Sequence, residues 1–544
     1  MKIALAQVNQ TVGKIAENTE KILQLARKAE DEQAELIVFP EFCVVGGYGY
    51  DLFKNKDFIL ASYKAMELIT SRTPIHTLCG VITNDKFNKN LINAVALFHD
   101  DNMSTVASKD ILDDSDFDDK KYFKFSGFSN VFKISGKNIA CVIADSADSV
   151  KKNIEKASWL GIDIVIVTSC SSYYKGKCSE IKNVLRQSAV DNAVDVAYVN
   201  MAGAHDGYVF DGGSLYVSKT GSFKALAANF KEDFIVFDTD GSDAEKEDIS
   251  AEKEMYEAAV SGLGDYCGKN GFKKCVLGVS GGIDSALTLA IAVDAMGKDN
   301  VLGVLMPSRH TSKESNLYAE DICSRLQVKT IVLPLDDIYG SYIKTMASVF
   351  EGKEQDSSEE NLQARIRSNF LMALSNKFGY LALCTCNKSE DAVGYSTLYG
   401  DAAGGYSPIG DLFKKEVYNL SRYRNSVSAV IPETIIKRAP TAELRDNQKD
   451  SDSLPEYDIL DDILEKMIDK KMTYNEIINS GISKDILDKV MKLLFLSEYK
   501  RRQSPTGTKF SKTAFLRDVI LPVTNGYIWK PMIEKNTQPD TERE

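Results

Sequence analysis

The chain has 544 residues, of which 44% are hydrophobic and 26% charged, so it resembles an ordinary globular protein that is too long for one core and needs two or three domains. The net charge of −12 argues against general nucleic-acid binding, because no overall positive field would attract phosphates. No apolar run approaches the roughly 20 residues that span a bilayer. The ten scattered cysteines and the lack of a signal peptide predict a cytoplasmic protein without a disulfide framework.

Residues 1–240 alternate short apolar runs with helical stretches. We expect helices at 18–30 and 179–192. The expected strands are 2–7, 36–39, 77–82, 94–98, 139–143, 164–167, 197–200 and 215–217. This alternation predicts a layered α/β domain. The stretch Asp238–Asp248 is acidic, polar and contains glycine, which indicates a linker. We therefore place a first domain at 1–240 and a linker at 241–252.

A second α/β domain is predicted at 253–534. Its expected elements alternate between helix and strand: helix 251–269, strand 275–279, helix 285–296, strand 301–306, helix 313–326 and strand 330–334. Strand–helix–strand spacing of this kind predicts a doubly wound parallel sheet. Residues 351–360 indicate a mobile loop, and the tail 535–544 is predicted to be disordered.

The strongest motif of the second domain is Ser280-Gly281-Gly282-Ile283-Asp284-Ser285, between a predicted strand and an apolar helix. Its two glycines let the backbone approach an anion closely, and the helix N-terminus directs unpaired N–H groups to the same point. The serines add hydroxyl donors, and Asp284 adds a carboxylate for a divalent cation. An ordinary Gly-Ser turn would not need this full set, so we predict a phosphate site. The spacing is not that of the kinase and GTPase loop.

This loop resembles that of the ATP-pyrophosphatases, which cleave ATP between the α and β phosphates and adenylate an acceptor. Later stretches narrow the resemblance to the NAD synthetase family over nearly all of residues 250–530. They are MPSRHTS at 306–312, ENLQARIR at 360–367, TCNKSE at 385–390, GYSTLYGD at 394–401, APTAEL at 439–444 and EYKRRQ at 498–503. The family fold is a doubly wound parallel sheet of the adenine nucleotide α-hydrolase type.

The resemblance implies a role for each matched position. It assigns ATP to Gly278, Ser280, Gly281, Gly282, Ile283, Asp284, Ser285, Thr385, Lys414 and Thr441. It assigns deamido-NAD to Asn361, Arg365 and Lys500, the last also stabilising phosphate charge, and Mg²⁺ to Asp284 and Glu390. One departure is Cys386, where the family usually has glycine.

The implied reaction forms NAD from deamido-NAD, ATP and ammonia through an adenylate, releasing AMP and pyrophosphate. Its partners are small molecules, with neither nucleic acid nor membrane, and the family resemblance implies a homo-oligomer. Two other functions are compatible with a fold of this class. A non-catalytic assembly protein is disfavoured, because the phosphate loop, Glu390 and Lys414 are intact. Amide formation on another acceptor is the remaining enzymatic alternative.

The first domain carries motifs that resemble the nitrilase superfamily, and specifically the glutaminase domain fused to such synthetases. This resemblance implies an α-β-β-α sandwich. Glu41 in FPEF and Lys109 in SKDIL match the catalytic base and lysine of that family. Ser171 and Lys177 match positions on the glutamine side of the site.

The expected thiol nucleophile of this domain is missing. After the predicted strand at 139–143, where the family has C-E-D-x-W, this chain has Ala144 followed by Asp145, and alanine cannot form a thioester. Other departures are LDDS at 112–115 in place of L-P-N-Y, in a stretch one residue short, and Asp119 in place of a supporting glutamate. Divergence to an inactive scaffold explains all of these. An engineered Cys-to-Ala change in a glutamine-dependent enzyme explains position 144 alone, so we favour divergence.

Two other cysteines were considered as substitute nucleophiles. Cys141 lies three residues before Ala144 on the same strand and should face the opposite way. Cys170 ends the neighbouring strand, close to the site, but most buried cysteines act as small hydrophobic residues. Without a nucleophile, Glu41 and Lys109 would form only a buried ion pair.

Overall fold

The computed structural model describes residues 1–85, 90–109, 117–124, 128–245, 248–441, 443–445, 450–515 and 517–527. The chain divides into two compact units, Met1–Asn270 and Gly271–Glu544, here called the first and second unit. The predicted α/β class is confirmed in both. Within the described ranges, no helix is long and apolar enough to cross a membrane. The predictions for 112–115 and 535–544 lie outside the described residues.

Two six-stranded sheets form the centre of the first unit. The first has the order β14-β1-β2-β3-β4-β5, and the second has the order β13-β12-β9-β8-β7-β6. The first consists of β1 (Lys2–Gln7), β2 (Leu36–Val38), β3 (His76–Asn84), β4 (Leu91–His99), β5 (Asn102–Ser108) and β14 (Asp233–Asp238). The second consists of β6 (Phe132–Ile134), β7 (Lys137–Ile143), β8 (Ile164–Ser169), β9 (Asp195–Asn200), β12 (Leu215–Val217) and β13 (Phe223–Leu226). A hairpin of β10 (Ala202–His205) and β11 (Tyr208–Asp211) accompanies them.

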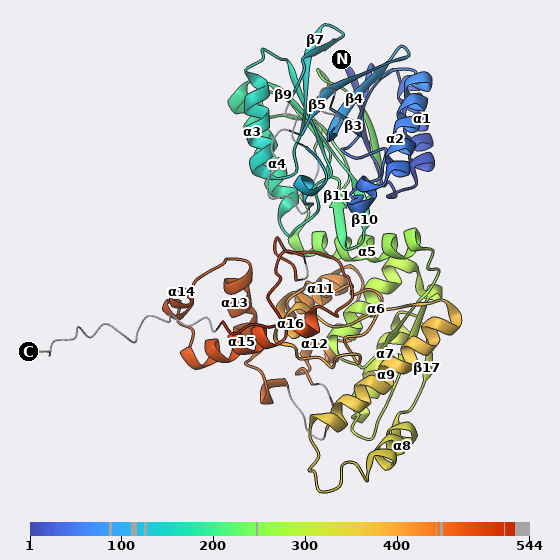
Figure 1. Ribbon diagram of the computed structural model, residues 1–544, viewed down its shortest axis with the longest axis vertical. Coiled ribbons are helices and arrows are strands. Elements are labelled where there is room, and N and C mark those ends of the chain that lie inside the picture. Colours follow the sequence, from blue (N-terminus) through green and yellow to red (C-terminus); the bar gives the residue numbers. More distant parts are fainter. Residues whose placement is uncertain are drawn as a thin grey trace, which may run out of the picture. The chain divides into compact units, whose positions relative to one another are not determined.

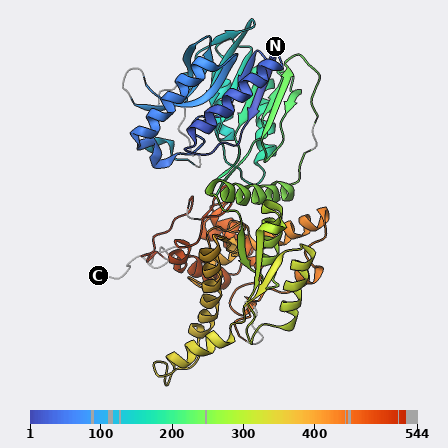
Figure 2. The ribbon, with the colours of Figure 1, turned by 90° about the vertical axis from the view of Figure 1, so that its right-hand side faces the viewer.

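Each sheet is buried on both faces, as the strand β1 illustrates. Ile3 and Leu5 pack into the core between the sheets, whereas Ala4 and Ala6 face the helices outside, because successive side chains of a strand point to opposite sides. Helices α1 (Ile15–Asp31) and α2 (Lys56–Arg72) cover the first sheet, and α3 (Ala147–Ser158) and α4 (Lys177–Asn192) cover the second. Figure 1 shows the two helix pairs on opposite sides of the stacked sheets, and Figure 2 shows α1 and α2 face on. The predicted α-β-β-α sandwich is confirmed.

The helix α5 (Ala251–Asn270) packs with the first unit. Lys269 Nζ donates to Asn9 Oδ1 at 2.6 Å and to the carbonyl oxygen of Ala204 at 2.7 Å. Asp265, one turn earlier, accepts from Asn9 Nδ2 at 2.8 Å. The first helix of the second predicted domain therefore lies in the first unit, and the domain limits at 240 and 253 remain predictions.

The second unit is built on a four-stranded parallel sheet of order β17-β16-β15-β18. Its strands are β15 (Cys275–Gly278), β16 (Val301–Leu305), β17 (Lys329–Val332) and β18 (Leu381–Ala382). The chain moves outward from β15 to β16 and β17 and then returns to the other side of β15. Ligands of doubly wound sheets bind where the strand order reverses in this way, beyond the carboxyl ends of the strands. The loop after β15 lies at that point.

Helices surround this sheet and extend beyond it. Those near the sheet are α6 (Ile283–Met296), α7 (Lys313–Arg325), α8 (Asp336–Met346), α9 (Ser357–Phe378), α10 (Lys388–Val393), α11 (Lys414–Val427) and α12 (Glu433–Lys437). A further group of helices, seen together in Figure 1, shares one apolar core: α13 (Tyr457–Ile468), α14 (Tyr474–Asn479) and α15 (Lys484–Leu496), followed by α16 (Glu498–Arg501). Short 3-10 turns occupy Tyr50–Lys54, Asp119–Lys121, Lys298–Asn300 and Asp450–Asp452.

The predicted element order agrees with the structure, apart from strand and helix ends and several unpredicted elements. One prediction was wrong in part. Residues 351–360 were predicted to form a loop, but α9 begins at Ser357. Asp356 caps this helix by accepting from Ser358 N at 2.7 Å, while Glu359 accepts from Asp356 N at 2.9 Å. This reciprocal capping starts a helix within a polar stretch whose composition suggested a loop.

Candidate active sites

The loop Ser280–Ser285 is held by its own side chains at the N-terminus of α6. Ser285 Oγ donates to the carbonyl oxygen of Gly282 at 3.0 Å, and Gly282 N donates to Ser280 Oγ at 3.3 Å. Gly281 has a φ of +81°, a conformation that favours glycine. The two serines therefore stabilise the loop itself.

Gly281→Ala should destabilise the second unit by about 2 kcal/mol, because a backbone at positive φ would be strained. In addition, the added Cβ would lie 2.3 Å from the carbonyl oxygen of Ser315. Gly282→Ala is the matched control, since its φ is −90° and its Cβ would meet only Ser280 Oγ, at 3.4 Å. The midpoints of urea-induced unfolding of the two variants check this. Equal midpoints would contradict the steric requirement at position 281.

A cavity of about 280 Å³ opens at the carboxyl end of this sheet. Nearly all residues that the sequence assigned to ATP line it: Gly278, Ser280, Gly282, Ile283, Asp284, Ser285, Thr385, Lys414 and Thr441. Gly281 is not among the lining residues, because its Cα faces Ser315. Glu390, assigned to the metal, also lines the cavity. The fold thus brings the sequence-assigned ATP and metal residues into one site.

The three residues assigned to deamido-NAD lie beside this cavity and are not among its lining residues. All three contact the segment 394–401. Asn361 accepts from Thr397 Oγ1 at 2.7 Å, and Arg365 and Lys500 donate to backbone oxygens of the segment at 3.2 and 2.7 Å. The segment itself lines the cavity through Tyr395, Gly400 and Asp401. In this structure the three residues support one wall of the site.

Lys414 joins the two carboxylates that were assigned to the metal. Its Nζ lies 2.6 Å from Asp284 Oδ2 and 3.0 Å from Glu390 Oε1. Burial raises the pKa of Glu390 to about 8, with Lys414 opposing that change. Burial alone would lower the pKa of Lys414, but the carboxylates of Asp284 and Glu390 raise it overall. The two carboxylates are therefore close enough to contact the same cation, and a nearby positive charge stabilises their ionised forms.

The motif Asn387-Lys388-Ser389-Glu390 places four side chains in four different contacts. Asn387 caps α10 and donates to Asp284 Oδ1 at 2.8 Å, which links the helix to the phosphate loop. Lys388 is fully buried and pairs with Asp411 at 2.9 Å. Ser389 contacts α13, and Glu390 faces the cavity. Sequence reasoning selected only Glu390 from this motif as a site residue.

Two arginines that sequence reasoning missed also line the cavity. Arg438 pairs with Glu443 at 2.6 Å and donates to Ser315 Oγ at 2.6 Å, next to Gly281. Burial lowers the pKa of Arg367 to about 10, and its Nε donates to a backbone oxygen after β16 at 3.2 Å. Single arginines in a sequence are normally surface charges. The available signals were the place of Arg367 at the end of the ENLQARIR stretch and the place of Arg438 directly before APTAEL.

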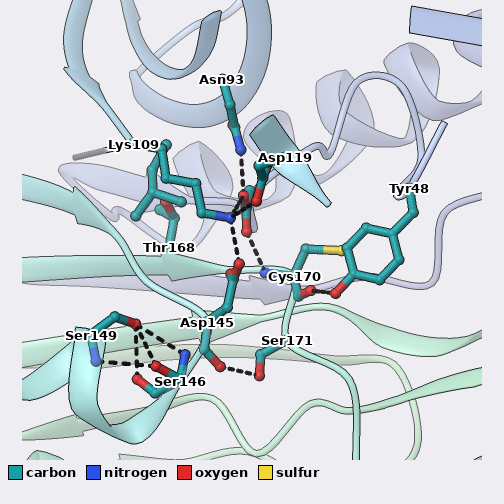
Figure 3. A network of polar contacts seen from close by, with 12 residues as sticks. Tyr48, Asn93, Lys109, Asp119, Asp145, Ser146, Ser149, Thr168, Cys170 and Ser171 are labelled. Carbon is teal, nitrogen blue, oxygen red and sulfur yellow. Dashed lines mark hydrogen bonds and ion pairs between the residues drawn. The ribbon is translucent and has the colours of Figure 1, made fainter. Parts of the chain in front are cut away.

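Lys109 is the centre of the amidase-like site in the first unit. Its Nζ lies 3.2 Å from Glu41 Oε1 and 2.6 Å from Asp119 Oδ2, and it also contacts Asp145. Figure 3 shows the ammonium group between the carboxylates of Asp119 and Asp145. Burial and then Asp145 raise the pKa of Glu41 well above its ordinary value. The predicted ion pair is thus part of a buried cluster of one cation and three acids.

Glu41 makes further contacts at the ends of neighbouring strands. It accepts from Asn93 Nδ2 at 2.5 Å and from the backbone N–H of Cys170 at 2.9 Å. Both carboxylate oxygens are therefore engaged within the protein. In this arrangement Glu41, which matches the family's catalytic base, joins Asn93 of β4 to Cys170, which follows β8.

Ala144 directly follows the strand β7, and its side chain lies in the core between the second sheet and its helices. Cys141 lies in the opposite core, between the sheets, as its spacing predicted. Cys170 is fully buried with its sulfur 4.0 Å from that of Met201, and burial raises the pKa of its thiol well above the ordinary value. Neither thiol is in a form that favours nucleophilic attack.

The two residues matched to the glutamine side are engaged with protein groups. Lys177 is almost fully buried, and its Nζ donates to Asp211 Oδ1 at 2.6 Å and to the carbonyl oxygen of Ser171 at 2.7 Å. Ser171 Oγ donates to the carbonyl oxygen of Asp145 at 2.5 Å. A chain of contacts thus links the matched residues. Glu41 contacts Lys109, Lys109 contacts Asp145 beside Ala144, and Asp145 accepts from Ser171, whose carbonyl oxygen accepts from Lys177.

Comparisons with known proteins match both parts of the chain. The family model of NAD synthase matches residues 255–504, and that of carbon-nitrogen hydrolase matches residues 2–246. Among curated proteins, the glutamine-dependent NAD(+) synthetases of Xanthomonas campestris and Thermotoga maritima are each 37% identical to this chain. The matches cover 97% of the chain and 98% and 99% of these relatives, respectively.

Two solved structures cover 97% of the chain. The glutamine-dependent NAD+ synthetase of Acinetobacter baumannii, in complex with ADP, is 35% identical with a TM-score of 0.78, over 99% of its own chain. That of Cytophaga hutchinsonii has a TM-score of 0.83 at 19% identity, over 98% of its own chain, and supports the fold alone.

Proposed function

Because the chain belongs to the family of glutamine-dependent NAD synthetases, with a carbon-nitrogen hydrolase domain before an NAD synthase domain, it is a ligase, and we propose that it takes its nitrogen from free ammonia. The synthetase cavity carries the phosphate loop, Lys414 and both acids. The amidase-like site has alanine at the nucleophile position. That single substitution is the observation on which the choice of ammonia rests.

The proposed reaction has two steps in the cavity of the second unit. The nicotinate carboxylate of deamido-NAD attacks the α-phosphorus of ATP and releases pyrophosphate. Ammonia then attacks the carbonyl carbon of the adenylate and expels AMP, giving the amide of NAD. The ADP bound to the Acinetobacter baumannii relative supports the proposal that this chain binds an adenine nucleotide.

The residues of the cavity would act mainly by positioning and by electrostatics. The Ser280–Ser285 loop and the N-terminus of α6 would hold the phosphates through N–H groups. Lys414 would balance charge that develops on the leaving pyrophosphate.

Asp284 and Glu390 fit Mg²⁺, because they approach the same ammonium group within 3.0 Å and the ion commonly uses one or two carboxylates together with substrate phosphates. When bound, the ion would neutralise phosphate charge.

The alternative is a glutamine-using enzyme that was changed at position 144 alone. It accounts for Ala144 but not for Asp145, whose carboxylate contacts Lys109. We therefore propose that the first unit has diverged and no longer hydrolyses glutamine.

The test measures NAD formation with deamido-NAD, ATP and Mg²⁺, using either ammonium or ammonia-free glutamine as the nitrogen source. We expect AMP and pyrophosphate as products with ammonium, and a rate with glutamine of less than about 1% of that rate, because grouped catalytic residues lose nearly all activity without the nucleophile. Release of ADP and phosphate would reject the adenylate mechanism. Comparable rates with the two sources would reject the ammonia proposal and leave the synthetase assignment intact.

A further inference from the structure

One face of α13 contacts both helices that carry charged residues of the synthetase cavity. Tyr457 and Asp461 lie four residues apart on this helix and so share a face. Asp461 is fully buried. A buried carboxylate is costly unless donors satisfy it, so its partners indicate why it is there.

The two oxygens of Asp461 bind two different helix starts. Oδ1 accepts from the hydroxyl of Ser389, in the first turn of α10, and Oδ2 accepts from the backbone N–H of Lys415, in the first turn of α11, at 2.9 Å. Ser389 Oγ in turn accepts from the backbone N–H of Lys414 at 2.9 Å. Asp461 and Ser389 therefore fix the first turns of α10 and α11 relative to each other.

These two turns carry charged groups that line the synthetase cavity. Glu390 directly follows Ser389, and Lys414 directly precedes Lys415. The same face of α13 also contacts the far end of the lysine, since Lys414 Nζ lies 4.9 Å from the centre of the Tyr457 ring. The Tyr457 hydroxyl is fixed by donation to Asp450 Oδ2 at 2.9 Å. The backbone and the ammonium group of Lys414 are thus both supported by α13.

We propose that Asp461 is a positioning residue of the synthetase, which acts through Ser389 to place Lys414 and Glu390 for pyrophosphate release. It touches neither substrate nor the reacting atoms. Without it, the Ser389 hydroxyl and the Lys415 N–H would need other acceptors, and the two helix starts would no longer be joined. Displacements of about 1 Å at such distances can lower rates by ~10²-fold.

The inference rests on the proposed role of Lys414, so the experiment includes that residue. Asp461→Asn keeps the shape but offers one acceptor oxygen in place of two. Ser389→Ala removes the hydroxyl that joins Asp461 to the backbone of Lys414, and it leaves the Asp461 carboxylate bound to the backbone N–H of Lys415. Asp458→Asn, on the exposed side of the same helix, is the matched control. Steady-state kcat and the KM for ATP are measured with saturating ammonium, together with the midpoint of thermal unfolding.

We expect Asp461→Asn and Ser389→Ala each to lower kcat by ~10-fold or more, with the KM for ATP within about 3-fold, because the misplaced groups act on the transition state. The loss of kcat in the double variant should be no greater than the larger of the two single losses, because both changes break the same connection. Asp458→Asn should retain kcat. If Asp461→Asn does not fold, Ser389→Ala carries the same test.

Two outcomes would overturn the inference: a folded Asp461→Asn or Ser389→Ala variant with normal kcat, or losses that multiply in the double variant. A lower unfolding midpoint with unchanged kcat would identify a purely structural role. Lys414→Ala distinguishes a failure of the proposed role of Lys414 from a failure of the positioning role of Asp461. Normal kcat in Lys414→Ala would reject the proposed function of that lysine, whereas its loss together with a fully active Asp461→Asn would reject only the positioning role.

Discussion

Asp284→Ala and Glu390→Ala are each expected to lower the turnover of NAD formation by at least ~10²-fold, because each removes a charged group from the site of phosphate chemistry. Both carboxylates face the cavity and meet at Lys414 Nζ. The Mg²⁺ concentration that gives half-maximal rate should also rise. Steady-state assays over a range of Mg²⁺ concentrations check both expectations.

The fold should survive these changes. Neither carboxylate lies in the apolar core, and removing Glu390 also relieves a buried acid whose pKa is raised to about 8. Asp294→Asn serves as the control, since Asp294 lies on the same helix as Asp284 but pairs with Arg424 and is not among the residues that line the cavity. A near-normal rate in either alanine variant, with unchanged magnesium dependence, would remove that residue from the proposed metal site.

Ala144→Cys is expected not to restore glutamine hydrolysis, leaving less than about 1% of the ammonium-dependent rate when glutamine is the nitrogen source. The introduced thiol would be buried, and the departures at 112–115 and at Asp119 would remain. The thiol would also neighbour Asp145, whose carboxylate contacts Lys109. A nearby negative charge raises the pKa of a thiol and so lowers the fraction of reactive thiolate. Glutamate and NAD formation from ammonia-free glutamine measure the result.

A second variant tests the proposed reason. In Ala144→Cys with Asp145→Asn, one negative charge is absent, so alkylation of residue 144 by iodoacetamide should be faster than in Ala144→Cys alone. Ala147→Cys, three residues later at the start of α3, controls for a thiol placed nearby. Robust glutaminase activity in Ala144→Cys alone would mean that the pocket is otherwise competent and that divergence at the remaining positions is without effect.

Features that a few consecutive residues encode could be predicted from the sequence. The phosphate loop is one, because its glycines, serines and helix start are adjacent, and the structure places it after β15 at the point where the strand order reverses. The strand–helix alternation likewise predicted a layered α/β first domain and a doubly wound parallel sheet in the second, whereas the α-β-β-α sandwich followed from the family resemblance. The opposite orientations of Cys141 and Ala144 followed from the two-residue period of a strand. The catalytic roles of these residues stay predictions.

The sequence did not predict which buried polar groups contact each other in the fold. Lys109 contacts Asp145 across 36 positions, Ser389 contacts Asp461 across 72, and Lys414 contacts Asp284 across 130. A carboxylate in a sequence is usually a solvated surface charge, and neither its type nor its spacing tells which partner it will have. Burial makes the partner decisive, because an ionised group removed from water must be satisfied by whichever donor the fold brings within hydrogen-bonding distance.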